Sequence, residues 1–151
     1  MTTTRLPCGD VRGNFADGVY SFKGLPFAEP MTGLANWLPP VPSARWNEAR
    51  DARSYGPLFM QFGRGAKALS ATRRQYLDAC GANLGTPEGD DSLLLNVWTP
   101  TQDRNAALPV MVWVHGGGFA SGGANELYDG AHFARAGVVC VAIQYRLGPQ
   151  G

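Results

Sequence analysis

A histidine and three glycines directly follow an apolar run at residues 109–123, PVMVWVHGGGFASGG. Residues 110–114 are apolar throughout and rich in β-branched side chains, which predicts a central strand buried on both faces, as in a parallel sheet. Glycines at the end of such a strand let the backbone turn sharply and leave N–H groups unobstructed. N–H groups of this kind can hold the negative oxygen of a tetrahedral intermediate in acyl transfer. The stretch therefore predicts an oxyanion-binding turn.

Two other interpretations of these glycines compete with this one. Glycines at a strand end often form only a turn. A dinucleotide-binding loop also lies between a strand and a helix, but Ser121 follows Gly116 and Gly118 where the GxGxxG pattern has its third glycine. The next predicted strand ends in IQYR at residues 143–146, without the acidic residue that binds a ribose, and no GK[ST] phosphate loop occurs. The complete HGGGF string therefore favours the oxyanion interpretation.

The composition of the whole chain indicates one ordinary globular domain. Of the 151 residues, 44% are hydrophobic and 17% are charged. Thirteen basic and twelve acidic residues give a net charge of +1, so charge predicts neither a nucleic-acid partner nor an anionic membrane surface. No apolar run approaches the ~18 residues of a spanning helix, and no signal-peptide pattern opens the chain. We expect a soluble, cytoplasmic protein.

Cysteine usage agrees with a reducing compartment. Cys8, Cys80 and Cys140 are an odd number without a CxxC pair, so they predict neither a disulfide framework nor a zinc site. Cys140 lies within the apolar run VVCVAI and is expected to be a small core residue.

Elements that could position the glycine turn can be predicted on both sides of it. Their sequence patterns indicate a hairpin over residues 11–28 with its turn at 14–18, a helix within 64–84, a strand over 92–98, a helix over 128–136 and a strand over 138–145. The order strand, glycine loop, helix, strand after residue 109 predicts a βαβ crossover. We therefore expect an α/β fold in which an antiparallel hairpin precedes a central, mostly parallel sheet.

Short motifs spread over nearly the whole chain carry a family resemblance. They are VRG at residues 11–13, FKGLPFA at 22–28, Trp37 before Pro39-Pro40, Trp46 before RDA at 50–52 and YGP at 55–57, LNVWTP at 95–100, HGGGF at 115–119, YDG at 128–130 and YRLG at 145–148. On these motifs the chain resembles the N-terminal part of the type B carboxylesterase and cholinesterase family of α/β-hydrolases. Hormone-sensitive-lipase-like esterases share HGGG and a tyrosine-arginine-leucine, but not FKGLPFA or LNVWTP.

The resemblance implies a specific chemistry. Members of this family hydrolyse carboxylic esters through an acyl-serine intermediate without a metal or organic cofactor, so the expected partner is a small-molecule ester. By this resemblance Gly117 and Gly118 supply two backbone N–H groups of the oxyanion hole, and Gly116 permits the turn. The serine, acid and histidine of the triad are expected beyond Gly151, because the family's GxSxG elbow is absent from the chain. Residues 1–151 are thus expected to be a partial α/β-hydrolase domain that is inactive by itself.

Other residues depart from the family pattern or have a weaker interpretation. Phe59 and Ser92 stand where many members have a disulfide, and their joint replacement fits a reducing compartment. Ser121 has no elbow around it and is a weak candidate nucleophile. His115 resembles a structural position of the family, and His132 is expected on a helix, at the surface or partly packed.

A non-catalytic, cholinesterase-like interaction domain is the alternative function, since some relatives keep the fold without the nucleophile. The sequence leaves the ester substrate and the oligomeric state open.

Overall fold

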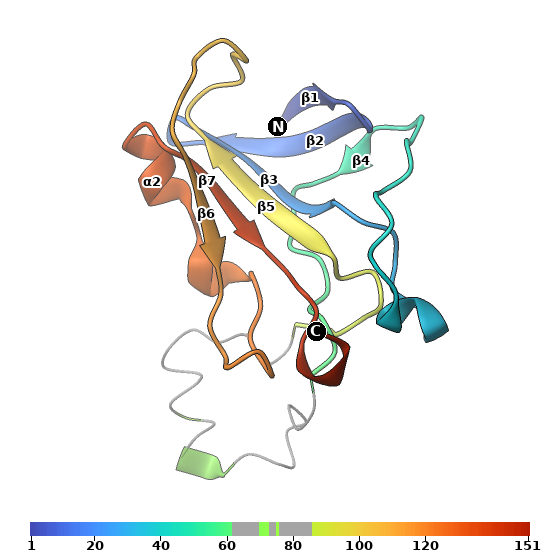
Figure 1. The fold of residues 1–151 in the computed structure, drawn as a ribbon. Coiled ribbons are helices and arrows are strands. Elements are labelled where there is room, and N and C mark those ends of the chain that lie inside the picture. Colours follow the sequence, from blue (N-terminus) through green and yellow to red (C-terminus); the bar gives the residue numbers. More distant parts are fainter. Residues whose placement is uncertain (62–69, 73–74, 76–85) are drawn as a thin grey trace.

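In the part of the chain that it describes, the computed structural model consists mainly of strands, with a helix near the C-terminus, short helical turns and a two-residue strand. The structure describes residues 1–61, 70–72, 75 and 86–151 (Figure 1). The elements are β1 Thr2–Leu6, β2 Gly9–Ala16, β3 Val19–Pro26, η1 Gly33–Trp37, β4 Arg50–Asp51, β5 Leu94–Thr99, β6 Val110–Val114, η2 Glu126–Tyr128, α2 Ala131–Arg135, β7 Val139–Ile143 and η3 Gly148–Gln150. The helix predicted within residues 64–84 falls largely outside the described residues. None of the helices in the described part is long and apolar enough to cross a membrane.

The strands form one twisted sheet in the order β1-β2-β3-β5-β7-β6, with β4 paired to β2 (Figure 1). The pairs β1–β2, β2–β3, β3–β5 and β5–β7 are antiparallel, whereas β2–β4 and β6–β7 are parallel. The sequence predicted a mostly parallel central sheet, and within the described residues this detail is corrected: the sheet is mixed. Parallel neighbours need a crossover connection, and in the described part of the chain the segment between β6 and β7, which contains α2, is one.

The antiparallel start of the chain is confirmed, and its turn has a clear local cause. β2 and β3 are joined by Asp17 and Gly18, whose φ values of 50° and 76° are those of a two-residue hairpin turn. β1 pairs with β2 and was not predicted, because its sequence TTTRL carries little apolar alternation.

The predicted crossover after residue 109 is also confirmed. β6 and β7 pair in parallel from Val110 against Val139 to Val114 against Ile143. The intervening helix is shorter than predicted, since residues 126–128 form a separate 3₁₀ turn and α2 begins at Ala131. It ends at Arg135, and Gly137, with a φ of 85°, then takes the left-handed conformation that stops the helix, as expected.

The core lies between the sheet and α2, with buried residues from β3, β5, β7 and the helix. One cluster of buried residues comprises Val19, Trp98, Ala124, Ala134, Cys140 and Ala142. The expected core position of Cys140 is therefore confirmed, with 3% of the residue exposed. Of two tryptophans in the family-like motifs, Trp46 packs against a second cluster and donates to the Asp10 carbonyl at 2.8 Å, whereas Trp37 is 61% exposed.

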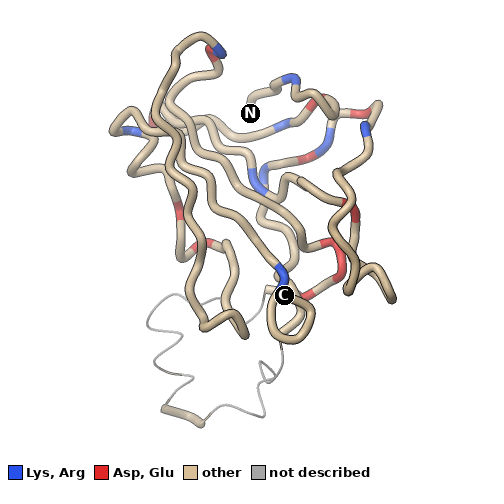
Figure 2. The backbone as a smooth tube through the Cα atoms, viewed as in Figure 1, with Lys and Arg blue, Asp and Glu red and all other residues tan. Residues whose placement is uncertain are grey.

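β6 occupies the edge of the sheet, which corrects the prediction of a buried central strand. Val110, Val112 and Val114 are each more than half exposed. The physical reasons are that no other strand of the described residues pairs with the second side of β6, and that little of the described chain covers the face that carries these three valines. Residues 105–125 contain no Lys, Arg, Asp or Glu, so this edge is also uncharged (Figure 2).

Candidate functional site

The glycine loop follows β6 at the end of the sheet where β7 also ends, close to the C-terminal turn η3 (Figure 1). The loop closes on itself, because the Gly117 carbonyl accepts hydrogen bonds from the N–H groups of Ala120 and Ser121, both at 3.2 Å. A further hydrogen bond of 2.7 Å from the Gly148 N–H to the Phe119 carbonyl ties the loop to η3. The loop is thus an ordered turn anchored at its tip.

Left-handed backbone conformations explain why two of the glycines are required. Gly117 and Gly118 have φ values of 130° and 63°, which side chains disfavour, whereas Gly116 has no such φ. The turn is therefore made by Gly117 and Gly118, and the expectation that Gly116 permits it is corrected. A Cβ atom on Gly117 would overlap with the carbonyl oxygen of Ser121, while one on Gly118 or Gly116 would meet no atom of the described residues within 4 Å.

The two predicted donor groups belong to exposed residues. Gly117 and Gly118 are both exposed, and within the described part of the chain neither backbone N–H has a hydrogen-bond acceptor. Accessible N–H groups on neighbouring residues of a fixed turn are suited to bind an anionic oxygen.

His115 anchors the start of the loop. It is only 2% exposed, and its Nδ1 lies 3.0 Å from the Gly116 carbonyl oxygen, so the proton is assigned to Nδ1. Its ring stacks on Tyr145 with centroids 4.3 Å apart, and the Tyr145 hydroxyl donates to the His115 carbonyl at 2.5 Å. These contacts fix the carbonyls of residues 115 and 116, which constrains the direction of the N–H groups that follow. This arrangement agrees with the structural role expected for His115.

Burial of His115 predicts a pH dependence of stability. Burial lowers the pKa of its imidazole below the ordinary value of 6.5, and the hydrogen bond to Gly116 opposes this shift. As the pH falls through 6.5, the unfolded chain therefore takes up this proton before the folded protein does. We expect the imidazole to make no contribution above that pH and to lower the free energy of unfolding progressively below it.

Urea unfolding of the wild type and of His115→Gln, both in the longer protein proposed below, between about pH 8 and about pH 5 checks this expectation. The variant should lose less free energy of unfolding on acidification than the wild type. His132→Gln is the matched control, since His132 is exposed as predicted, and it should keep the wild-type dependence. Equal losses for the wild type and His115→Gln would contradict the expectation.

Side-chain amides far away in the sequence hold the other end of the loop. Gln61 accepts from the Gly122 N–H at 2.9 Å through Oε1 and donates to the Gly122 carbonyl at 2.6 Å through Nε2. Asn96 donates to the Ala124 carbonyl at 2.9 Å, and Gln144 accepts from the Ala124 N–H at 3.3 Å. Both Asn96 and Gln144 are buried. The sequence analysis identified none of these three amides. For Asn96 a signal existed, because a polar residue inside the apolar run SLLLNVW indicates a buried side chain that needs hydrogen-bond partners.

Ser121 lacks the surroundings of a nucleophile. Its hydroxyl donates to the Gly117 carbonyl at 3.2 Å, and within the described residues no histidine nitrogen accepts from it. An activated serine needs a base at that position. The structure therefore agrees with the low rank given to Ser121.

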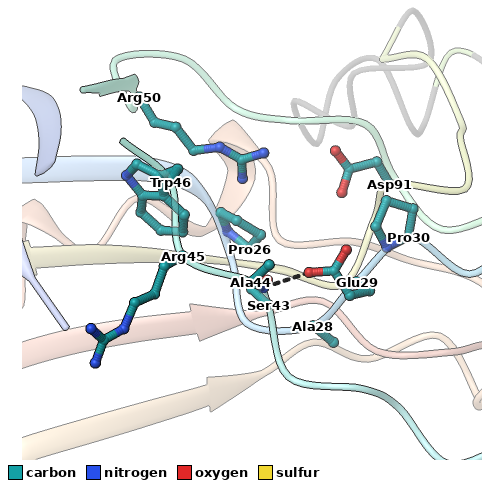
Figure 3. A pocket seen from close by; sticks show the side chains of 10 residues that line it. All are labelled: Pro26, Ala28, Glu29, Pro30, Ser43, Ala44, Arg45, Trp46, Arg50 and Asp91. Atoms are coloured by element: carbon teal, nitrogen blue, oxygen red, sulfur yellow. Dashed lines mark hydrogen bonds between the residues drawn. The ribbon is translucent and has the colours of Figure 1, made fainter. Parts of the chain in front are cut away.

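A separate small hollow of about 150 Å³ lies among the loops around Trp46 (Figure 3). Arg50 extends over the Trp46 ring, 5.0 Å from its centroid, and Glu29 accepts from the Ala44 N–H at 2.5 Å. These contacts hold the surrounding loops together. The hollow shares no residue with the glycine loop, and we assign the candidate site to the loop because the accessible N–H groups lie there.

Comparison with known proteins decides the family. The model of the carboxylesterase family matches residues 1–151. The chain belongs to the carboxylesterase family. It is 39% identical over 145 residues to phenmedipham hydrolase of Pseudarthrobacter oxydans, covering 95% of this chain and 27% of that protein. It is 37% identical over 153 residues to acetylcholinesterase of Electrophorus electricus, covering 98% of this chain and 22% of that protein.

Solved carboxylesterase structures have the same fold. A carboxylesterase of Geobacillus stearothermophilus superposes with a TM-score of 0.78 at 34% identity, covering 100% of this chain and 28% of that chain. The α/β-hydrolase fold class predicted from the sequence is confirmed, with the chain corresponding to the N-terminal region. The chain spans about a quarter of the length of the relatives it matches.

Proposed function

We propose that this carboxylesterase-family chain supplies two oxyanion donors, the N–H groups of Gly117 and Gly118, to an enzyme that hydrolyses small carboxylic esters through an acyl-serine intermediate. The observation that carries the proposal is a pair of exposed glycines whose backbone N–H groups have no acceptor among the described residues, in a turn fixed by His115 and Tyr145. In this enzyme a serine hydroxyl attacks the ester carbonyl, a histidine takes the hydroxyl proton and returns it to the leaving alcohol, and water then releases the acid. The two N–H groups stabilise the oxygen that becomes negative in each step.

The proposal places the catalytic serine, acid and histidine in sequence that follows Gly151. We call the product of this longer reading frame the full-length protein. Residues 1–151 by themselves form a partial domain and are expected to be inactive. We also propose a cytoplasmic location, which is supported by the free Cys8 and Cys140 and by Phe59 and Ser92 at the positions of the family disulfide.

The full-length protein is expected to hydrolyse 4-nitrophenyl acetate and to react with a fluorophosphonate at one serine. Mass spectrometry should place the label in a GxSxG motif after Gly151, and labelling should abolish hydrolysis. A stop codon directly after Gly151 would contradict the proposed longer enzyme. A folded full-length protein without hydrolysis or label would support the non-catalytic interaction domain, and a label on Ser121 would overturn the assignment of roles.

A further inference from the structure

Gln61 contacts the glycine loop from a segment that belongs to no part of the HGGGF motif. Its side-chain amide bonds both backbone polar groups of Gly122, with Oε1 to the N–H at 2.9 Å and Nε2 to the carbonyl at 2.6 Å. Gln61 thereby bonds the two peptide groups on either side of the Gly122 Cα atom, which fixes both the position and the orientation of this residue. The backbone of Gln61 is itself held, since its N–H donates to the Glu88 carboxylate at 3.1 Å.

Gly122 is packed directly against the start of the same loop. A Cβ atom at Gly122 would overlap with the Gly116 carbonyl oxygen and with Nδ1 of His115, and the φ of Gly122 is 111°. Gly122, which Gln61 holds, therefore forms one wall of the space that contains the His115–Gly116 hydrogen bond. A shift of Gly122 would loosen the contact that orients the carbonyl preceding Gly117.

The loop between these two anchors is short and internally closed. Gly117 accepts from Ala120 and Ser121, so a displacement at Gly122 is passed to Gly117 through one turn of backbone. The Asn96 and Gln144 amides hydrogen-bond Ala124 and not Gly122, so within the described residues Gln61 is the side chain that hydrogen-bonds Gly122.

We propose that Gln61 is a positioning residue of the oxyanion loop: through Gly122 it holds the N–H groups of Gly117 and Gly118 in the direction that the tetrahedral intermediate requires. The inference rests on the proposed function of these glycines. Small misplacements of preorganised donors reduce transition-state binding more than substrate binding. Loss of the Gln61 amide should therefore act on kcat and leave KM nearly unchanged.

The test uses Gln61→Ala and Gln61→Met in the full-length protein. Methionine keeps the length of the side chain and removes both hydrogen bonds, so it separates the amide contacts from packing. We expect both variants to lower kcat by about 10-fold or more, with KM within about twofold of wild type. Their affinity for a trifluoromethyl ketone, which forms a tetrahedral adduct, should fall in parallel with kcat. Gln102→Ala is the matched control, because Gln102 is also partly buried and bonds the hydroxyl of Thr2 away from the loop.

Rates are expressed per serine titrated by the fluorophosphonate, so that partly unfolded enzyme does not count. A purely structural role would lower the titrated fraction or the melting temperature and leave kcat per serine unchanged, and this result would overturn the inference. Gly117→Ala in the same assay distinguishes the two proposals. If it leaves kcat intact, the oxyanion function itself fails. If Gly117→Ala loses kcat while Gln61→Ala and Gln61→Met keep it, only the role of Gln61 fails.

Discussion

Gly117→Ala in the full-length protein should lower kcat for simple esters by about 10²-fold to 10³-fold, the typical effect of losing one oxyanion donor. A Cβ atom at this position would overlap with the Ser121 carbonyl oxygen, and the φ of 130° disfavours any side chain. The turn must therefore rearrange, which displaces the N–H groups of Gly117 and Gly118. KM should change little, because the ground-state ester oxygen carries no full charge. Steady-state kinetics per titrated serine measure the effect.

Gly116→Ala is the matched control for this substitution. Its Cβ would meet no atom of the described residues within 4 Å, and its backbone is not left-handed. We expect it to keep the wild-type melting temperature and to lose far less kcat than Gly117→Ala. A folded Gly117→Ala protein with kcat near the wild-type value would remove this glycine from the mechanism.

Gly118→Val should also lower kcat by about 10²-fold. Here the cause is backbone strain at the φ of 63°, since a Cβ atom at Gly118 meets no atom of the described residues within 4 Å.

Local signals explain which parts of the fold could be predicted. The hairpin turn, the strand before the glycines and the strand after α2 follow from residue type and period, and the structure has all three. The position of the glycine loop at the end of a strand follows from the same local pattern. The family of the chain could also be predicted, because the short motifs of the carboxylesterase family occur in their order along nearly the whole sequence.

Long-range contacts explain what could not be predicted. Gln61 and Gly122 are 61 positions apart, and no period within either segment indicates that they meet. The stacking of His115 on Tyr145 joins positions 30 apart for the same reason. The burial of the β6 side chains was overestimated. An apolar run shows that a strand is suited to a buried position, but it does not show which strands or helices cover it.

The exposed edge strand leads to the second large effect. When residues 1–151 are produced by themselves, we expect them to associate into large species and to bind a hydrophobic dye. β6 has one unpaired edge within the described residues, and Val110, Val112 and Val114 expose an apolar face beside it. Neither a charge nor a proline interrupts the strand, and these are the residues that normally prevent pairing between edges. Size-exclusion chromatography with light scattering measures the outcome.

Val112→Lys should shift the same polypeptide from mostly associated to mostly monomeric, because a lysine in the middle of the edge must be desolvated when two such strands pair. Val41→Lys is the matched control: Val41 is 61% exposed against 56% for Val112 but lies outside the named strands. It adds the same charge, so a general gain in solubility would appear equally in both variants, whereas an effect through the edge appears only in Val112→Lys. A wild-type chain that is monomeric and unfolds in one sharp transition would refute the edge mechanism, and it would favour a stand-alone interaction domain over a part of a larger enzyme.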